Sequence, residues 1–174
     1  ILGNHDYDLY TKDTNRQRVK SFRTVISKLS NIGWIYLVNE WTTFEELLIV
    51  GTDDHGDDKW SMSRGDIDKA YAGVPDEQLS TIVLTHNPTY ADEISMKYQP
   101  ELILCGHTHA GQVGWWFEFL DVIWSWSFAS NYKYWLDGYR LTGGITTLWV
   151  NRGLGYDILP LRSFAPEITI HEIN

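Results

Sequence analysis

The sequence has little cysteine and little positive charge. The first excludes a disulfide within the chain, and the second argues against nucleic-acid binding. Cys105 is the one cysteine among 174 residues, so no disulfide can form within the chain, which fits a reducing compartment. Lysine and arginine total 14 against 23 aspartates and glutamates, which gives a net charge of −9. A surface of that sign argues against the phosphate backbone of a nucleic acid as the main partner.

Long apolar runs are also missing. None approaches the roughly 18 residues that a membrane span requires, and no signal peptide is visible. What is present is a globular composition, with 43% hydrophobic and 21% charged residues. The length suffices for one domain with a substantial core.

Tryptophan is abundant, with nine in the chain, and four of them lie between Trp115 and Trp126. Further aromatic residues follow at Tyr132, Tyr134 and Trp135. This aromatic stretch is either a buried strand hairpin or an exposed lip that meets a lipid substrate or the membrane interface. Both alternatives stay open.

Periodicity indicates an α/β chain. A capping box at Thr14–Gln17 and an apolar face from Val19 to Ile32 predict a helix that ends at Gly33. Shorter helices are expected at 67–72 and near 90–97, with a turn at 42–46. Strands are expected at 34–38, 47–51, 81–84, 101–105 and 145–150, and alternation predicts a last strand at 167–173 that closes the sheet.

The segment from Leu104 to Gln112 reads Leu-Cys-Gly-His-Thr-His-Ala-Gly-Gln. It continues an apolar run that ends in a glycine turn, and His107 and His109 follow two positions apart. On an extended backbone such side chains point the same way. Neutral imidazole is a suitable ligand for Zn, Fe, Mn or Ni, so the pair would form half of a metal site. The alternative is a turn with two solvated histidines.

Two other segments have the same character. Gly3-Asn4-His5-Asp6 opens the chain, and Thr85-His86-Asn87-Pro88 follows the predicted strand 81–84. Each brings histidine or asparagine to a strand end that is followed by a turn. Ligands in α/β sheets bind at such strand ends.

These three motifs, in the order 3–6, 85–88 and 104–112 along the chain, resemble the calcineurin-like metallophosphoesterase superfamily. The segments 151–155, 159–162 and 165–169 are similar to one branch, the membrane-associated bacterial phosphoesterases that include enzymes cleaving the pyrophosphate of UDP-diacylglucosamine. The resemblance covers nearly the whole chain. It implies an α/β fold of two packed mixed β-sheets flanked by helices.

One part of the family pattern is absent. The family begins upstream with an Asp-x-His strand and a second strand ending in Gly-Asp, and neither occurs here. We therefore expect residues 1–174 to be the C-terminal portion of a single domain that lacks its first strand-helix-strand unit. Without those strands, the isolated chain is expected to be marginally stable or oligomeric.

The resemblance also implies two divalent metal ions, Mn, Fe or Zn. Asn4, His86 and His107 would ligate one ion and His109 the other, while the bridging aspartate and the remaining ligands belong to the absent strands. His5 would be catalytic, as a general acid or a charge stabiliser near the leaving group. The alternative for His5 is a histidine that supports the ligands from behind, or a surface histidine, in either case without a catalytic role.

Two further residues are candidates. Asp6 either orients a histidine or caps a turn. Arg152 follows a strand and precedes Gly-Leu-Gly, so its guanidinium would clasp a phosphate of the substrate, or else it forms an ion pair that ties the loop to the core.

The leading hypothesis is hydrolysis of a phosphate ester or pyrophosphate by a metal-bridging hydroxide. The alternatives are a catalytically incomplete metal- or membrane-binding module and a phosphoprotein phosphatase. Expected partners are a phosphate-ester or lipid-pyrophosphate substrate, peripheral membrane contact and a second copy of the chain. The expected location is the cytoplasm, either in solution or at the inner face of the membrane.

Overall fold

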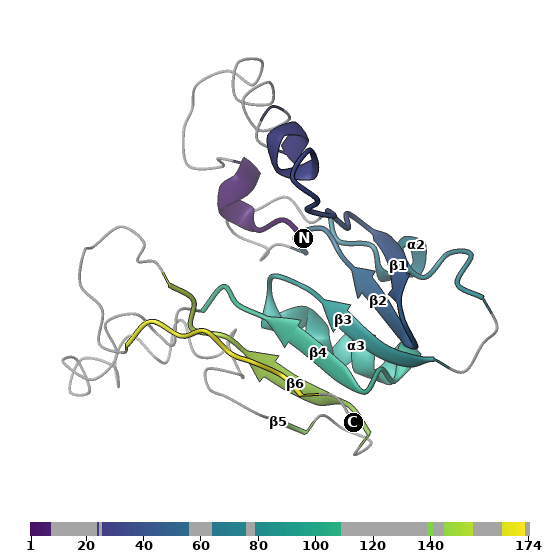
Figure 1. Ribbon diagram of the computed structural model, residues 1–174. Coiled ribbons are helices and arrows are strands. Elements are labelled where there is room, and N and C mark those ends of the chain that lie inside the picture. Colours follow the sequence, from purple (N-terminus) through teal and green to yellow (C-terminus); the bar gives the residue numbers. More distant parts are fainter. Residues whose placement is uncertain are drawn as a thin grey trace, which may run out of the picture. The chain divides into compact units, whose positions relative to one another are not determined.

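The computed structural model describes residues 1–7, 24, 26–55, 64–75, 79–108, 139–140, 145–154 and 165–172 of the chain. The chain divides into two compact units, Ile1–His86 and Asn87–Asn174, and each is described by itself. The elements, coloured along the sequence in Figure 1, are η1 (Asn4–Tyr7), β1 (Glu40–Phe44), β2 (Leu47–Gly51), α2 (Ile67–Ala70), β3 (Ser80–Leu84), η2 (Pro88–Tyr90), α3 (Ala91–Tyr98), β4 (Leu102–Cys105), β5 (Tyr139–Arg140) and β6 (Thr147–Val150).

The strands of the first unit run in the order β1-β2-β3 (Figure 1). Strands β1 and β2 form an antiparallel hairpin in which Phe44 pairs with Leu47, and β2 pairs with β3 in parallel. Glu45 takes the positive φ of 53° that two-residue hairpin turns require. The buried apolar side chains of this unit are Leu2, Leu37, Leu48, Val50, Ile67, Ala70 and Val83.

The helix before β1 ends as predicted. Residues 26–30 are helical, and Gly33 has a φ of 92°. Its N–H donates to Ser30 O at 3.0 Å and Trp34 N–H donates to Leu29 O at 3.1 Å, the two bonds of a Schellman motif. Glycine suits this position because it lacks the Cβ that penalises left-handed backbone. The predicted capping box at Thr14–Gln17 lies outside the described residues.

The predicted strand at 34–38 is wrong, and so is most of the turn at 42–46. The strand begins at Glu40 instead, and the turn shrinks to Glu45 and its neighbour. The apolar run that suggested the earlier strand is not buried, since Trp34 is 59% and Ile35 is 73% exposed. Asn39, with a φ of 57°, then redirects the backbone into β1.

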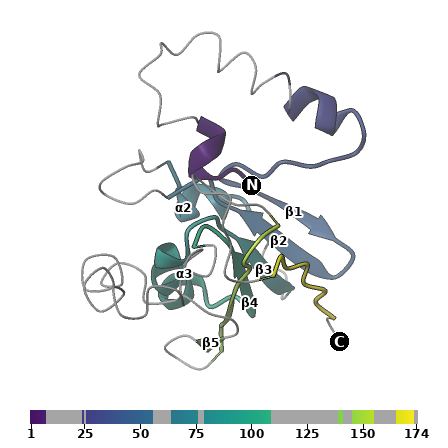
Figure 2. The ribbon, with the colours of Figure 1, turned by 90° about the vertical axis from the view of Figure 1, so that its left-hand side faces the viewer.

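In the second unit, β4 and β6 pair in parallel with Cys105 opposite Val150, and β5 pairs with β6 antiparallel. Helix α3 lies alongside β4 (Figure 2). Asn87 caps η2, the turn that leads into α3, because its Oδ1 accepts hydrogen bonds from Thr89 N at 3.0 Å and Thr89 Oγ1 at 2.8 Å. The buried apolar side chains are Tyr90, Ala91, Ile94, Ile103, Cys105, Leu148 and Val150.

The remaining expectations are mostly confirmed. The helices near 67–72 and 90–97 and the strands at 47–51, 81–84, 101–105 and 145–150 occur within a few residues of their predicted bounds. The strand at 167–173 is wrong for the described residues 165–172, which carry no strand. The α/β class is confirmed, because each unit mixes parallel and antiparallel pairs with helices.

None of the helices within the described ranges has the length and apolar character needed to cross a bilayer. The single-domain organisation and the marginal or oligomeric character of the chain stay predictions.

Candidate functional site

The structure brings Asn4 and His86 into direct contact. Asn4 begins η1 and is only 6% exposed, and His86 follows the end of β3. His86 Nε2 lies 2.9 Å from Asn4 Oδ1, although 82 positions separate the two residues. In this contact the imidazole N–H donates and the amide oxygen accepts. Two of the predicted metal ligands therefore share one place in the first unit.

Gly3 makes room for the His86 ring. A Cβ at Gly3 would lie 2.7 Å from both Cε1 and Nδ1 of His86, and 2.9 Å from Nε2. Real Cβ atoms do not approach so closely, so the ring packs directly against a backbone that only glycine provides. The sequence motif contained this glycine, but nothing in its pattern indicated that the imidazole would pack there.

Asp6 caps the turn that carries Asn4. Its Oδ2 accepts a hydrogen bond from Gly3 N at 2.8 Å, while its own N–H donates to Gly3 O at 3.1 Å. These reciprocal bonds close the turn around Asn4. Of the two alternatives for Asp6, the structure shows the capping role.

Buried hydroxyls join the ends of β2 and β3. Thr52 Oγ1 donates to Thr85 Oγ1 at 2.9 Å, and both residues are fully buried. Thr52 N also donates to Leu84 O at 3.0 Å, which continues the ladder past the strands. Because Thr85 immediately precedes His86, these bonds fix the backbone from which the imidazole projects.

Asn39 fastens the segment that follows β2. Its Oδ1 accepts hydrogen bonds from Asp53 N and Asp66 N, both at 2.9 Å, and its Nδ2 donates to Arg64 O at 2.9 Å. One buried side chain thus holds both ends of the segment between Asp53 and Asp66. No sequence pattern marked Asn39, because its partners are 14 to 27 residues away.

In the second unit, His107 has a strained backbone. Its φ is 69°, and Thr108 N donates to Gly106 O at 2.8 Å, which makes His107 the centre of a γ-turn with positive φ. Such a conformation costs about 1–3 kcal/mol and is concentrated at functional sites. Asn151 N donates to Cys105 O at 2.8 Å, so the ends of β4 and β6 lie side by side.

Cys105 is a core thiol and not a candidate ligand. Burial raises the pKa of the Cys105 thiol far above its ordinary value, which keeps the sulfur protonated. Its Sγ donates a weak hydrogen bond to Trp149 O at 3.5 Å. Thiolate is the form that binds metal or attacks, so Cys105 is unsuited to either task.

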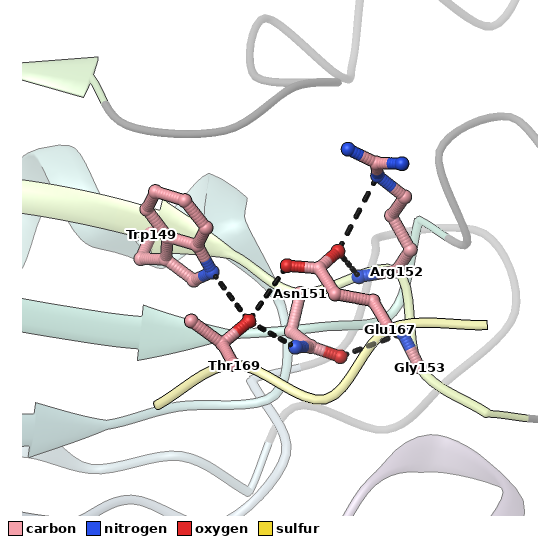
Figure 3. A network of polar contacts seen from close by, with 6 residues as sticks. All are labelled: Trp149, Asn151, Arg152, Gly153, Glu167 and Thr169. Atoms are coloured by element: carbon pink, nitrogen blue, oxygen red, sulfur yellow. Dashed lines mark hydrogen bonds and ion pairs between the residues drawn. The ribbon is translucent and has the colours of Figure 1, made fainter. Parts of the chain in front are cut away.

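Arg152 follows β6 and pairs with the C-terminal segment 165–172 (Figure 3). Its Nε lies 3.3 Å from Glu167 Oε2, which also accepts a hydrogen bond from Arg152 N at 3.1 Å. Thr169 Oγ1 donates to Glu167 Oε1 at 2.6 Å. The ion pair foreseen as one alternative for Arg152 is therefore present, with Glu167 as its partner.

No motif in the sequence marks Glu167 and Thr169 as site residues. Their alternation predicts a strand, although an acidic residue in that pattern is also a candidate counter-ion for Arg152. Burial, the strongest single influence, would raise the pKa of Glu167. Hydrogen bonds from Thr169 and Arg152, with the charge of Arg152, outweigh it, so the pKa lies below its ordinary value.

Other predicted site features fall outside the described residues, namely the side chain of His5, the residue His109 and the aromatic stretch 115–135. Within the described ranges, no cluster of three or more histidine, cysteine, aspartate or glutamate side chains is arranged to hold a metal ion. Among the described residues of the first unit, the predicted ligands that meet are one imidazole and one amide oxygen.

The Asn4–His86 pair fits a metal ion by its donor chemistry. Imidazole nitrogen and amide oxygen are both suitable ligands for Mn, Fe or Zn. The observed Nε2–Oδ1 separation of 2.9 Å is the length of a hydrogen bond between the two groups. The contact therefore brings two candidate ligand atoms to one place, and a bound ion would take the place of the imidazole proton between them.

Comparison with known proteins places these motifs in a family. The sequence model of the calcineurin-like phosphoesterases matches residues 1–111. An uncharacterized metallophosphoesterase of Helicobacter pylori strain J99 is 30% identical over 166 residues, which are 95% of this chain and 39% of that protein. The uncharacterized metallophosphoesterase YkuE of Bacillus subtilis is 39% identical over 99 residues, or 56% of this chain and 32% of that protein.

The chain therefore spans about two fifths of the length of the Helicobacter relative. No solved structure gives a significant match.

Proposed function

Because this chain belongs to the calcineurin-like phosphoesterase family, we propose that it takes part in the hydrolysis of a phosphate ester or pyrophosphate that depends on divalent metal ions. The proposal rests on one observation above others, the 2.9 Å contact between Asn4 Oδ1 and His86 Nε2 in a partly buried, glycine-dependent position. Two metal-compatible atoms from distant motifs meet there.

In this proposal Asn4, His86 and His107 hold one ion and His109 holds a second, with Mn, Fe or Zn as the candidates. Bound ions would supply positive charge to the phosphoryl oxygens and lower the pKa of a water molecule, so that hydroxide forms near neutral pH. The positive φ of His107 supports its place in the ligand set, because strained backbone persists where function requires a fixed side chain.

The chain's other residues would act on the substrate directly. His5 would donate a proton to the leaving-group oxygen, or stabilise its charge, since imidazole titrates near neutral pH. Arg152, 30% exposed beside the end of β6, would bind a phosphoryl oxygen through its guanidinium.

For the substrate we propose a phosphodiester or pyrophosphate, with a lipid-linked one preferred over a phosphopeptide. The support is the resemblance to the UDP-diacylglucosamine branch and the aromatic stretch 115–135. Peripheral membrane contact through that stretch belongs to the same proposal. A phosphopeptide cleaved faster than a lipid pyrophosphate would reverse the preference.

The proposal is tested by metal content and turnover together. The purified chain is dialysed against Mn²⁺ or Zn²⁺, its metal is measured by elemental mass spectrometry, and hydrolysis of bis(4-nitrophenyl) phosphate is followed. We expect at least one bound ion and chelator-sensitive hydrolysis. His86→Ala should lose the ion and reduce kcat/KM by roughly 100-fold or more.

His171→Ala is the matched control. His171 is exposed, and it lies far along the chain from the proposed ligands. Its ring packs edge-on against Trp149, with 5.6 Å between the two ring centroids. Metal content and turnover should survive that change. A folded chain with no bound metal and no hydrolysis would overturn the proposal, and equal metal loss in both variants would remove His86 from the ligand set.

A further inference from the structure

We propose that Glu167 is a positioning residue, which orients the guanidinium of Arg152 toward the phosphate of the substrate. This inference rests on the proposed function, in which Arg152 contacts that phosphate. Glu167 itself would then be part of the substrate site, acting through Arg152.

The first support is the manner in which Glu167 holds Arg152. A single oxygen, Oε2, accepts a hydrogen bond from the Arg152 backbone N–H at 3.1 Å and lies 3.3 Å from the side-chain Nε, a contact between opposite charges. This differs from the two-pronged arginine–carboxylate pair, in which two nitrogens meet two oxygens. Figure 3 shows the two terminal nitrogens of Arg152 extending away from Glu167. The edge of the guanidinium best suited to a phosphate is therefore not the edge that Glu167 engages.

The second support is that Glu167 is itself fixed. Thr169 Oγ1 donates to its other oxygen, Oε1, at 2.6 Å. The same hydroxyl accepts hydrogen bonds from Asn151 Nδ2 at 2.9 Å and Trp149 Nε1 at 3.2 Å. Glu167 N donates to Gly153 O at 3.1 Å. A carboxylate held this way gives the arginine one direction, which lowers the entropy lost when a ligand binds.

The third support is where the ends of β4 and β6 lie. Cys105 pairs with Val150, and Asn151 N continues the ladder by donating to Cys105 O at 2.8 Å. His107 and Arg152 each stand two positions beyond that pair. A proposed metal ligand and a proposed phosphate contact thus leave neighbouring strand ends at the same offset.

The Arg152–Glu167 pair is not needed to attach the C-terminal segment to β6 and the residues after it. A partly exposed ion pair contributes little to stability. The bonds of Thr169 to Asn151 and Trp149, and of Glu167 N to Gly153 O, already attach the segment. Direction of the guanidinium is what the pair adds.

The experiment measures phosphate binding and turnover in a double-mutant cycle of Arg152→Ala and Glu167→Gln. Inorganic phosphate is titrated without added metal, and the Arg152 Nε–H signal is followed by ¹H–¹⁵N NMR where the arginine is present. That signal is identified by its loss in Arg152→Ala. In the Arg152→Ala background, calorimetry measures the phosphate affinity, and steady-state hydrolysis of bis(4-nitrophenyl) phosphate is measured with Mn²⁺.

We expect Glu167→Gln to shift the Arg152 Nε–H signal, and to weaken phosphate binding and raise KM by roughly five- to tenfold, with kcat changed less than about twofold. In the Arg152→Ala background the same change should have no further effect, because Glu167 acts through the arginine. Glu172→Gln, an exposed acid of the same segment, is the matched control and should leave both constants unchanged.

Two results would overturn the inference while leaving the proposed function in place. In the first, the chain hydrolyses the substrate but Glu167→Gln leaves its phosphate affinity unaltered. In the second, Glu167→Gln changes the phosphate affinity equally in chains with and without Arg152, which would mean that Glu167 has only a structural role. Conversely, absent hydrolysis with phosphate binding that still depends on both residues would overturn the proposed function and retain the positioning role.

Discussion

The two units hold their candidate residues at strand ends by different means. In the first, the His86 ring packs against Gly3 and meets Asn4 Oδ1, so steric fit places the side chain. In the second, His107 sits in a strained γ-turn, and Arg152 is directed by a network of polar bonds from the C-terminal segment.

The difference predicts how each region responds to substitution. A ring packed against a backbone either fits or is displaced, so small changes at Gly3 should act almost all-or-none. A network spreads its effect over several bonds, each contributing about 1 kcal/mol, so losing one should give a graded response.

The largest expected effect is that of Gly3→Ala. The new methyl would overlap the His86 ring, which must swing away from Asn4. Because the ring has two rotatable bonds, the fold should tolerate this, with the Tm changed by less than roughly 4 °C. Bound metal should be lost and kcat/KM should fall by roughly 100-fold. Elemental mass spectrometry, thermal melting and bis(4-nitrophenyl) phosphate hydrolysis measure the three quantities.

Gly106→Ala is the counterpart in the second unit. Among the described residues, a Cβ at Gly106 would meet nothing closer than Asn151 O at 3.8 Å, an ordinary contact. Metal content should persist and kcat/KM should change by less than about threefold. Equal losses in the two alanine variants would contradict the steric account, because both glycines precede a proposed ligand but, of the described contacts, the one with an imidazole belongs to Gly3.

Strand ends and their polar residues were predictable from the sequence, because short apolar runs and glycine turns are local signals. The runs before His86 and His107 are examples, and so is the helix stop at Gly33. The contact between Asn4 and His86 was not readable from either motif alone, since 82 residues separate them. The family resemblance supplied their shared role.

The two wrong strands show where local patterns mislead. The run at 34–38 is apolar yet exposed, since Trp34 and Ile35 leave most of their surface uncovered. In the described residues 167–172, Glu167 and Thr169 form side-chain hydrogen bonds with Arg152 and Asn151, which follow β6, and no strand pairing accompanies these bonds. Whether an alternating segment pairs through its backbone depends on neighbours that the segment itself does not specify.

The next largest effect should come from Asn39, the network residue of the first unit. Asn39→Ala removes three hydrogen bonds and leaves alanine at a φ of 57°. We expect a loss of about 2–4 kcal/mol in the free energy of unfolding, measured by urea denaturation. Asn39→Asp keeps the acceptor and should cost about 1–2 kcal/mol. Equal costs for the two variants would show that the acceptor contacts contribute nothing.

A smaller effect is expected at Thr169, the centre of the second unit's network. Thr169→Val keeps the shape but loses the hydroxyl that contacts Glu167, Asn151 and Trp149. The expected cost is about 1–2 kcal/mol by urea denaturation, whereas Thr169→Ser, which keeps the hydroxyl, should cost less than about 1 kcal/mol. A serine variant as unstable as the valine variant would assign the effect to the methyl group instead.

The smallest effect is a pH dependence carried by Glu167. Its hydrogen bonds and the Arg152 charge outweigh burial and hold the pKa below its unfolded value of about 4.3. A lowered folded pKa means that the carboxylate stabilises the fold above the unfolded pKa, and that this stability is lost as pH falls through the folded pKa. Glu167→Gln should therefore cost less than about 1 kcal/mol at pH 7, and the difference from the unmodified chain should shrink as pH falls through the folded pKa. Urea denaturation from pH 7 downward into acid measures the difference, with Glu172→Gln as the control that should show no such trend. A cost that stays constant with pH would mean that Glu167 acts through packing, and the second unit would then resemble the first in depending on steric fit.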